Sequence, residues 1–141
     1  MTTVYIIDNT GDLISAAGRR LANASVCENE VQCLNRLETG EPAIVFCYYP
    51  VLDEVTIELI EMLRQVNAAA EIIVVGNQLP EEQIIKCLLA GAKGYQNIDT
   101  LSQYIDKLIK VVAGGEAWVS RKMVAKLIDY WRRLHPAEAA L

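Results

Sequence analysis

The chain has 141 residues, of which 52% are hydrophobic and 22% charged, and its formal net charge is −5. That length suits one domain with a substantial core. No apolar run is long enough to span a bilayer, and the N-terminus lacks the pattern of a secretory signal, so we expect no membrane contact and a cytoplasmic location.

Short apolar, β-branched runs alternate with amphipathic helical patterns along the chain. The patterns predict strands over 4–8, 24–27, 43–48, 71–76 and 93–97, and helices over 11–23, 29–40, 53–66, 80–91 and 100–115. Such alternation predicts an α/β fold in which helices cover both faces of a doubly wound, five-stranded parallel sheet. Sheets of this kind bind ligands at the carboxyl ends of their strands. Here those ends are Asp8-Asn9, Cys47 to Tyr49, Gly76-Asn77 and Asn97-Ile98.

A last helix is predicted over 120–134, with Ser120 as its cap. Its apolar positions recur at helical spacing and form one stripe. They are Met123, Val124, Leu127, Ile128, Trp131 and Leu134. The stripe either packs back on the domain, forms a helical dimer seam, or docks on a second domain.

Charge is divided unevenly. Residues 1–117 carry 8 Lys/Arg and 16 Asp/Glu, whereas residues 118–134 carry five basic residues and one acidic residue. The acidic body should repel nucleic acid. The basic segment is either a solvated helix face, the simpler interpretation, or a phosphate contact.

The four cysteines and the single histidine suggest no metal or redox chemistry. No pair among Cys27, Cys33, Cys47 and Cys87 has CxxC spacing, so we expect small, buried apolar residues in a reducing compartment. His135 lies in a polar tail. The sequence predicts no metal site and no cofactor.

Three segments carry a family pattern. They are "YIIDNTGDLISAAGRRLA" (5–22), "LLAGAKGYQNID" (88–99) and "VVAGGEAWVSRKMVAKLI" (111–128). The first resembles the opening strand and helix of the receiver domain in bacterial two-component response regulators of the LuxR/NarL type. The second resembles that family's AGA-x-GY-x-x-K segment, and the third resembles its GG-x-x-W-x-S linker. The resemblance covers nearly all of residues 4–134 and implies a flavodoxin-like receiver fold over 1–115, with a linker helix and tail over 116–141.

The chemistry of that family uses five groups. Two acids after the first strand bind Mg²⁺, an Asp after the third accepts a phosphoryl group, and a Ser or Thr and a Lys after the fourth and fifth contact it. The resemblance assigns Asp8 and Asn9 to the two acids, Gly76 to the hydroxyl position and Ile98 to the lysine. Tyr95 matches the family's switch aromatic.

The position of the acceptor stays open. Counting forward from Pro42 points to Tyr48, counting back from the turn at 50–53 points to Phe46, and Cys47 lies between them. None of the three is Asp. Four of the five groups are therefore missing, which implies a pseudo-receiver that does not work by conventional aspartyl phosphorylation.

Two interpretations of the altered pocket remain. In the first, its aromatic residues only fill the volume of the lost metal and water. In the second, the pocket binds another ligand through Tyr48, Tyr49, Asn9 and Asn77. We expect no enzymatic activity, because no nucleophile–base pair is visible.

Three functions are weighed. The first is a dimerising regulatory module that controls an attached helix-turn-helix DNA-binding domain, which would follow the linker and is not in this sequence. The second is a stand-alone adaptor that binds a partner protein through the face around Tyr95. The third is a small-ligand sensor.

Overall fold

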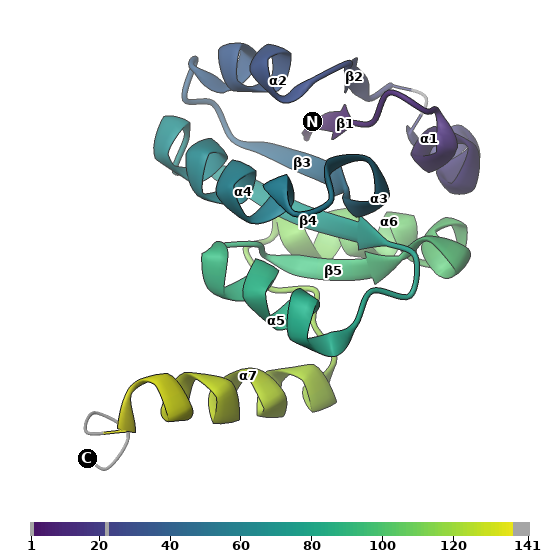
Figure 1. Cartoon of the computed structure of the whole chain (residues 1–141). Helices are drawn as coiled ribbons and strands as arrows, with labels where there is room; N and C mark the ends of the chain where they lie inside the picture. Colours follow the sequence, from purple (N-terminus) through teal and green to yellow (C-terminus); the bar gives the residue numbers. More distant parts are fainter. Residues whose placement is uncertain (1, 22, 137–141) are drawn as a thin grey trace.

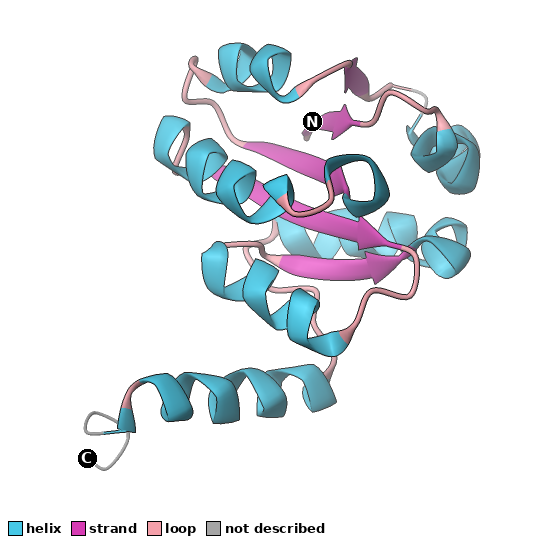
Figure 2. Cartoon of the chain, viewed as in Figure 1, coloured by secondary structure: helices cyan, strands magenta, loops and turns pink. Residues whose placement is uncertain are grey.

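The structure, a computed structural model, describes residues 2–21 and 23–136. Its centre is a parallel sheet of five strands in the order β2-β1-β3-β4-β5 (Figure 1, Figure 2). The strands are β1 Thr3–Ile7, β2 Ser25–Cys27, β3 Ala43–Tyr48, β4 Ala70–Gly76 and β5 Gly94–Asn97. This arrangement confirms the predicted doubly wound α/β fold.

Helices cover both faces of the sheet (Figure 1). One face is covered by α2 Glu30–Leu37, α4 Val55–Val66 and α5 Glu81–Ala90, and the other by α1 Asp12–Ala17 and α6 Leu101–Ala113. The short helix α3 Tyr49–Leu52 follows β3, and α7 Arg121–Leu134 lies beside α5. Short 3₁₀ turns span Gly18–Leu21 and Ile98–Thr100. No described helix is long and apolar enough to cross a membrane.

The central strand β3 is buried along its whole length, and its side chains alternate between two apolar cores. Val45 and Cys47 join the core under α2, α4 and α5. Phe46 and Tyr48 join the core under α1 and α6. Burial on both faces explains why this strand is continuously apolar in sequence.

Local sequence signals mark the boundaries of α2, α5 and α7. The Asn29 side chain accepts a hydrogen bond from the Gln32 N–H at 3.0 Å. Ser120 caps α7 in the same way, accepting from the Met123 N–H at 3.1 Å, as predicted. Pro80 and Gly91 bracket α5.

Two boundary predictions were wrong. The helix expected over 11–23 ends at Ala17, because Gly18 has a φ of 70° and the chain continues as a 3₁₀ turn. The helix α3 was not predicted. It begins right after β3 and has Pro50 in its first turn, where a missing N–H costs nothing.

Candidate functional site

The strand register brings the predicted site residues to one edge of the sheet. Ile7 pairs with Cys47, so Asp8 and Tyr48 follow at the ends of neighbouring strands. Tyr48 pairs with Val75, and Gly76 pairs with Asn97. Asp8, Tyr48, Gly76 and Ile98 therefore lie along the carboxyl ends of the four strands β1, β3, β4 and β5. We call this edge the carboxyl-end pocket.

Asp8 is buried, with 3% of its surface exposed, and its own loop binds both carboxylate oxygens. Oδ1 accepts hydrogen bonds from the Thr10 N–H at 2.9 Å and the Thr10 hydroxyl at 2.6 Å. Oδ2 accepts from the Leu13 N–H at 3.0 Å, in the first turn of α1. The carboxylate thus holds the β1–α1 loop against the helix N-terminus. Asn9 is exposed.

We expect Asp8→Ala to lower the free energy of unfolding by about 1.5–3 kcal/mol, because it leaves the buried Leu13 N–H without a partner. Asp8→Asn should cost less, since one amide oxygen can still accept. Urea denaturation of the two variants and the parent checks this. A loss of under about 0.5 kcal/mol for Asp8→Ala would show that the loop does not depend on the carboxylate.

The three candidates for the acceptor position point in different directions. Phe46 is fully buried in the α1–α6 core, and Cys47 points to the opposite core. Tyr48 lies at the strand end on the Phe46 side, with 6% of its surface exposed. Burial raises the pKa of the Tyr48 phenol, and the nearby Asp12 and Asp8 carboxylates raise it further. The phenol therefore stays protonated at neutral pH.

Tyr95 lies across Gly76. A Cβ added at Gly76 would lie 2.7 Å from the Tyr95 hydroxyl oxygen and 2.9 Å from its Cε1. The Tyr95 hydroxyl accepts a hydrogen bond from the Leu79 N–H at 3.3 Å. Burial raises the pKa of Tyr95. The ring thus fills the space at the end of β4 that a side chain at position 76 would need.

The end of β5 is closed by apolar and amide groups. Ile98 begins a 3₁₀ turn and packs against the α1–α6 core. Asn97 Oδ1 accepts from the Gln78 N–H at 2.7 Å, which holds the loop after β4. Asn77 is exposed. An aliphatic group therefore stands where the family resemblance would put a lysine.

The segment after α6 runs along the free edge of β5. Gly94 forms a parallel β-bridge with Trp118. The Trp118 N–H donates to the Lys93 carbonyl at 3.0 Å, and the Tyr95 N–H donates to the Trp118 carbonyl at 3.2 Å. The Trp118 indole N–H donates to Gln96 Oε1 at 3.0 Å. The sequence resemblance marked this tryptophan only as part of a linker, and neither it nor Gln96 was predicted to make this contact.

The linker segment also brings α7 to α5. Lys126 contacts the Glu81 carboxylate, and Lys122 lies 3.9 Å from it. The hydrogen bond from Lys126 holds the pKa of Glu81 below its usual value. These exposed ion pairs are weak, so packing of the half-buried Met123, Leu127 and Tyr130 supplies the rest of the contact.

The four cysteines are free and buried, as predicted, and all four lie in the core on one side of the sheet. Burial raises the pKa of Cys47, and raises that of Cys87 to about 11. Cys27 differs, because a hydrogen bond from Cys33 and the Arg36 guanidinium lower its pKa to about 7. Arg36 Nη1 lies 3.7 Å from Cys27 Sγ. Within the described residues, no group of three or more His, Cys, Asp or Glu side chains could hold a metal ion.

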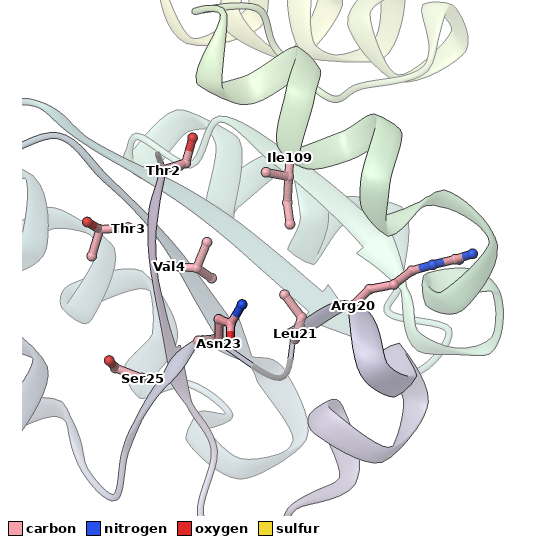
Figure 3. A pocket seen from close by; sticks show the side chains of 9 residues that line it. Thr2, Thr3, Val4, Arg20, Leu21, Asn23, Ser25 and Ile109 are labelled. Atoms are coloured by element: carbon pink, nitrogen blue, oxygen red, sulfur yellow. The ribbon is translucent and has the colours of Figure 1, made fainter.

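A hollow of about 470 Å³ opens at the other end of the sheet, beside the start of β1. Threonine, asparagine and serine side chains line it together with Val4, Leu21 and Ile109 (Figure 3). Arg20 extends away from it (Figure 3) and lies 3.2 Å from Asp106. The hollow lacks a buried polar group that could fix a ligand, because every buried side-chain N or O atom in the described residues has a hydrogen-bond partner.

Solved structures of known proteins resemble this chain in fold. No protein-family model and no curated protein matches this sequence. Among solved structures, a LuxR-family DNA-binding response regulator from Silicibacter pomeroyi matches with a TM-score of 0.69 at 19% identity, covering 86% of this chain and 99% of that one. A LuxR-family two-component response regulator from Aurantimonas sp. SI85-9A1 matches with a TM-score of 0.72 at 18% identity, covering 92% and 98%.

The isolated REC domain of RcsB from Salmonella enterica serovar Typhimurium matches with a TM-score of 0.71 at 15% identity, covering 92% of this chain and 99% of that one. Likeness at these identities establishes the fold. The chain has the receiver fold of response regulators, as the sequence resemblance predicted.

Proposed function

We propose that this chain is a receiver-like regulatory module of the LuxR/NarL response-regulator type that does not use conventional aspartyl phosphorylation. In this proposal Tyr48 occupies the acceptor position, Asn9 and Asp8 the metal positions, Gly76 the hydroxyl position and Ile98 the lysine position. The observation that carries the proposal is the filled carboxyl-end pocket. Tyr48 is buried there beside Asp8, whose two oxygens are already bound by its own loop.

The chemistry of the pocket supports this proposal. A protonated phenol is a poor nucleophile, and burial keeps the Tyr48 phenol protonated. No cation stands at position 98 to balance a phosphoryl group, because Ile98 packs into an apolar core. The Asp8 carboxylate already accepts three hydrogen bonds from its own loop, so little of its acceptor capacity is left for Mg²⁺.

In this proposal the module signals by assembling with another protein chain. The module would act in two-component signalling by dimerisation or partner binding, and would reach DNA only through a C-terminal helix-turn-helix domain outside this sequence. The alternative adaptor function would use the face around Tyr95. The bridge from Trp118 to Gly94 and the packing of α7 on α5 cover part of that face, which favours the first function. A cytoplasmic location and the absence of enzymatic activity belong to the same proposal.

The alternative function of a small-ligand sensor would use the carboxyl-end pocket itself. Tyr48 and Ile98 pack with the α1–α6 core at its floor, and Tyr95 fills the space over Gly76. A hollow of about 730 Å³ stays open beside Asp8 and Asn9. Asn9 and Asn77 are exposed at its rim. The packed floor favours the interpretation that the aromatic residues replace the volume of metal and water, with no new ligand.

Beryllium fluoride with Mg²⁺, a mimic of the aspartyl phosphate, tests the proposal. We expect it to leave the melting temperature and the solution mass unchanged, because the pocket offers no acceptor carboxylate. A phosphorylatable receiver measured in parallel serves as the positive control and should respond. A metal-dependent rise in melting temperature would contradict the proposal and would point to Asp53 or Asp8 as the acceptor.

A further inference from the structure

The fold brings two of the four cysteines together at the edge of the sheet. Cys27 ends β2, an edge strand of three residues that pairs with β1 (Figure 1). Cys33 lies in α2, the helix that follows. The sequence suggested no redox chemistry, because these cysteines lack CxxC spacing. The fold supplies the proximity that the spacing does not reveal.

Side-chain hydrogen bonds fix the turn between the two cysteines. The Gln32 N–H donates to Asn29 Oδ1 at 3.0 Å, and the Glu28 N–H donates to Gln32 Oε1 at 3.0 Å. These two bonds hold the first turn of α2 against the end of β2. The backbone therefore sets where Cys27 and Cys33 lie relative to each other.

The two thiols meet in the core under α2, α4 and α5. Both side chains are buried, and the Cys33 thiol donates a hydrogen bond to the Cys27 sulfur. Sulfur atoms within hydrogen-bonding reach of each other approach the geometry of a disulfide by side-chain rotation and a small shift of the chain.

Arg36 adds a positive charge to this pair. It lies one turn after Cys33, so the two residues share a face of α2. Its Nη1 lies 3.7 Å from Cys27 Sγ and 3.4 Å from the Val26 carbonyl oxygen. The Cys33 thiol and the Arg36 guanidinium stabilise the Cys27 thiolate and hold its pKa at about 7, although burial opposes them. About half of Cys27 is therefore thiolate at neutral pH.

The other cysteines differ from Cys27 in this respect. Burial raises the pKa of Cys47, and raises that of Cys87 to about 11. The hydrogen bond that Cys33 donates to Cys27 raises the pKa of Cys33. Because the thiolate is the nucleophile, Cys27 is the reactive sulfur among the four.

The cover over Cys27 is thin. Its neighbours in the chain, Val26 and Glu28, are exposed, and the exposed Arg36 lies against its sulfur. Val26 and Glu28 also line the hollow of about 730 Å³ at the carboxyl end of the sheet. Short edge elements open locally at a lower cost than global unfolding. We therefore expect a small oxidant to reach Cys27 in the folded domain.

We propose that Cys27 and Cys33 are a redox-active pair, which hydrogen peroxide converts to an intramolecular disulfide. The Cys27 thiolate attacks one peroxide oxygen and the O–O bond breaks. The hydroxide that leaves takes up the proton released by Cys27 and becomes water. The Cys33 sulfur then attacks the sulfenic acid on Cys27, the S–O bond breaks, and the hydroxyl group leaves as water with the Cys33 proton. The two thiols lose two electrons in all, and one peroxide is reduced to two water molecules.

This inference goes beyond the proposed function and does not depend on it. Cys27 pairs with Ile7, which precedes Asp8, so the disulfide would form at the same edge of the sheet as the carboxyl-end pocket. There it would tie the end of β2 to α2. The domain would then have a covalent input that needs neither an acceptor carboxylate nor a metal ion.

Peptide mapping after treatment with hydrogen peroxide tests the disulfide. The folded parent should lose two of its four free thiols, counted by alkylation after unfolding, and the link should map to Cys27 and Cys33. Dithiothreitol should restore both thiols. Retention of all four thiols or a link between other cysteines would overturn the inference. Equal oxidation of Cys47 and Cys87 would also overturn it, because peroxide would then react only with the unfolded chain.

Two variants assign the roles of the sulfurs. Cys33→Ser should leave Cys27 as a sulfenic acid, which dimedone traps, and Cys27→Ser should form neither the trapped product nor the disulfide. Cys87→Ala removes another buried thiol of the same core, so it is the matched control and should still form the link. Dimedone trapping at Cys33 in Cys27→Ser would overturn the assignment of Cys27 as the nucleophile.

Arg36→Gln tests the charge. Disulfide formation at pH 7 should slow about threefold or more, because less of Cys27 is ionised, and Arg36→Lys should keep part of the rate. At about pH 9.5 the parent and Arg36→Gln should react at similar rates, since the thiol ionises there without the guanidinium. An unchanged rate at pH 7, or the same slowing at both pH values, would overturn the activation of Cys27 by Arg36.

Discussion

Gly94→Ala releases the linker from the sheet edge. A Cβ at position 94 would lie 2.4 Å from the Trp118 carbonyl oxygen and 2.7 Å from the Trp118 Cβ, so the two segments cannot keep their present contact. The backbone at Gly94 does not require a positive φ, so alanine is strained only through this contact. We expect a loss of about 1–3 kcal/mol in the free energy of unfolding, as in other overpacked sites.

The loss has a specific signature. Displacement of Trp118 breaks its hydrogen bond to Gln96 and exposes the indole, which now lies 6.1 Å from the Tyr104 ring between centroids. Fluorescence in a Trp131→Phe background reports Trp118 alone and should shift to longer wavelength. Gly114→Ala is the matched control, since its nearest neighbours would lie at 3.4 Å or beyond. An unshifted emission in Gly94→Ala would mean that the linker does not depend on this close approach.

Gly76→Ala moves Tyr95 out of its inward position. The added Cβ would lie 2.7 Å from the Tyr95 hydroxyl oxygen and 3.2 Å from the Leu79 Cβ. The ring must leave and give up its hydrogen bond from the Leu79 N–H. The half-buried ring can swing outward, so we expect a loss of only about 1 kcal/mol, that of the hydrogen bond, measured by urea denaturation.

A double-mutant cycle distinguishes the clash with Tyr95 from any general effect of placing alanine at this strand position. In a Tyr95→Ala background, the Gly76→Ala change should cost less than about 0.5 kcal/mol, because the clash has been removed. Tyr95→Phe keeps the ring and loses only the hydroxyl, so it shows how much of the cost belongs to the hydrogen bond. Equal costs of Gly76→Ala in both backgrounds would contradict the proposed packing of Tyr95 over Gly76.

These two glycines each leave room for a neighbouring group to pack against the sheet. Gly76 makes room for the inward ring of Tyr95, and Gly94 makes room for the linker on the next strand. Gly76 ends β4 at the carboxyl-end pocket, whereas Gly94 begins β5 at the other end of that strand. The consequence for the proposed function is that the linker position is set by packing, with no need for a phosphoryl group in the pocket.

The sequence predicted the carboxyl-end pocket because strand ends are local features. Apolar runs ending in Asp8, Tyr48 and Gly76 identify where parallel strands stop, and all such ends meet at one edge. The direction of each side chain was less predictable. Two ways of counting along the sequence left Phe46, Cys47 and Tyr48 open, and a shift of one residue turns a strand position to the other face. The structure shows which core each of these side chains faces.

Contacts between distant segments were not predictable. The Gly94–Trp118 bridge joins residues 24 positions apart, and the contact of Lys126 with Glu81 joins residues 45 apart. Neither contact leaves a local sequence pattern. The need for glycine at position 94, for example, comes from Trp118, which lies far along the chain. The resemblance marked Tyr95 as important, but only its position over Gly76 shows that the ring points inward.

The sequence by itself determined the order of strands and helices and the parallel sheet, because periodicity is a local property. The tertiary structure alone decided which groups fill the pocket, where the linker docks and which side of α7 stays exposed. Those outcomes depend on shape and on many weak contacts between distant segments. For α7 the result is a helix whose sequence predicts one apolar stripe of six residues, of which only Met123 and Leu127 are half-buried.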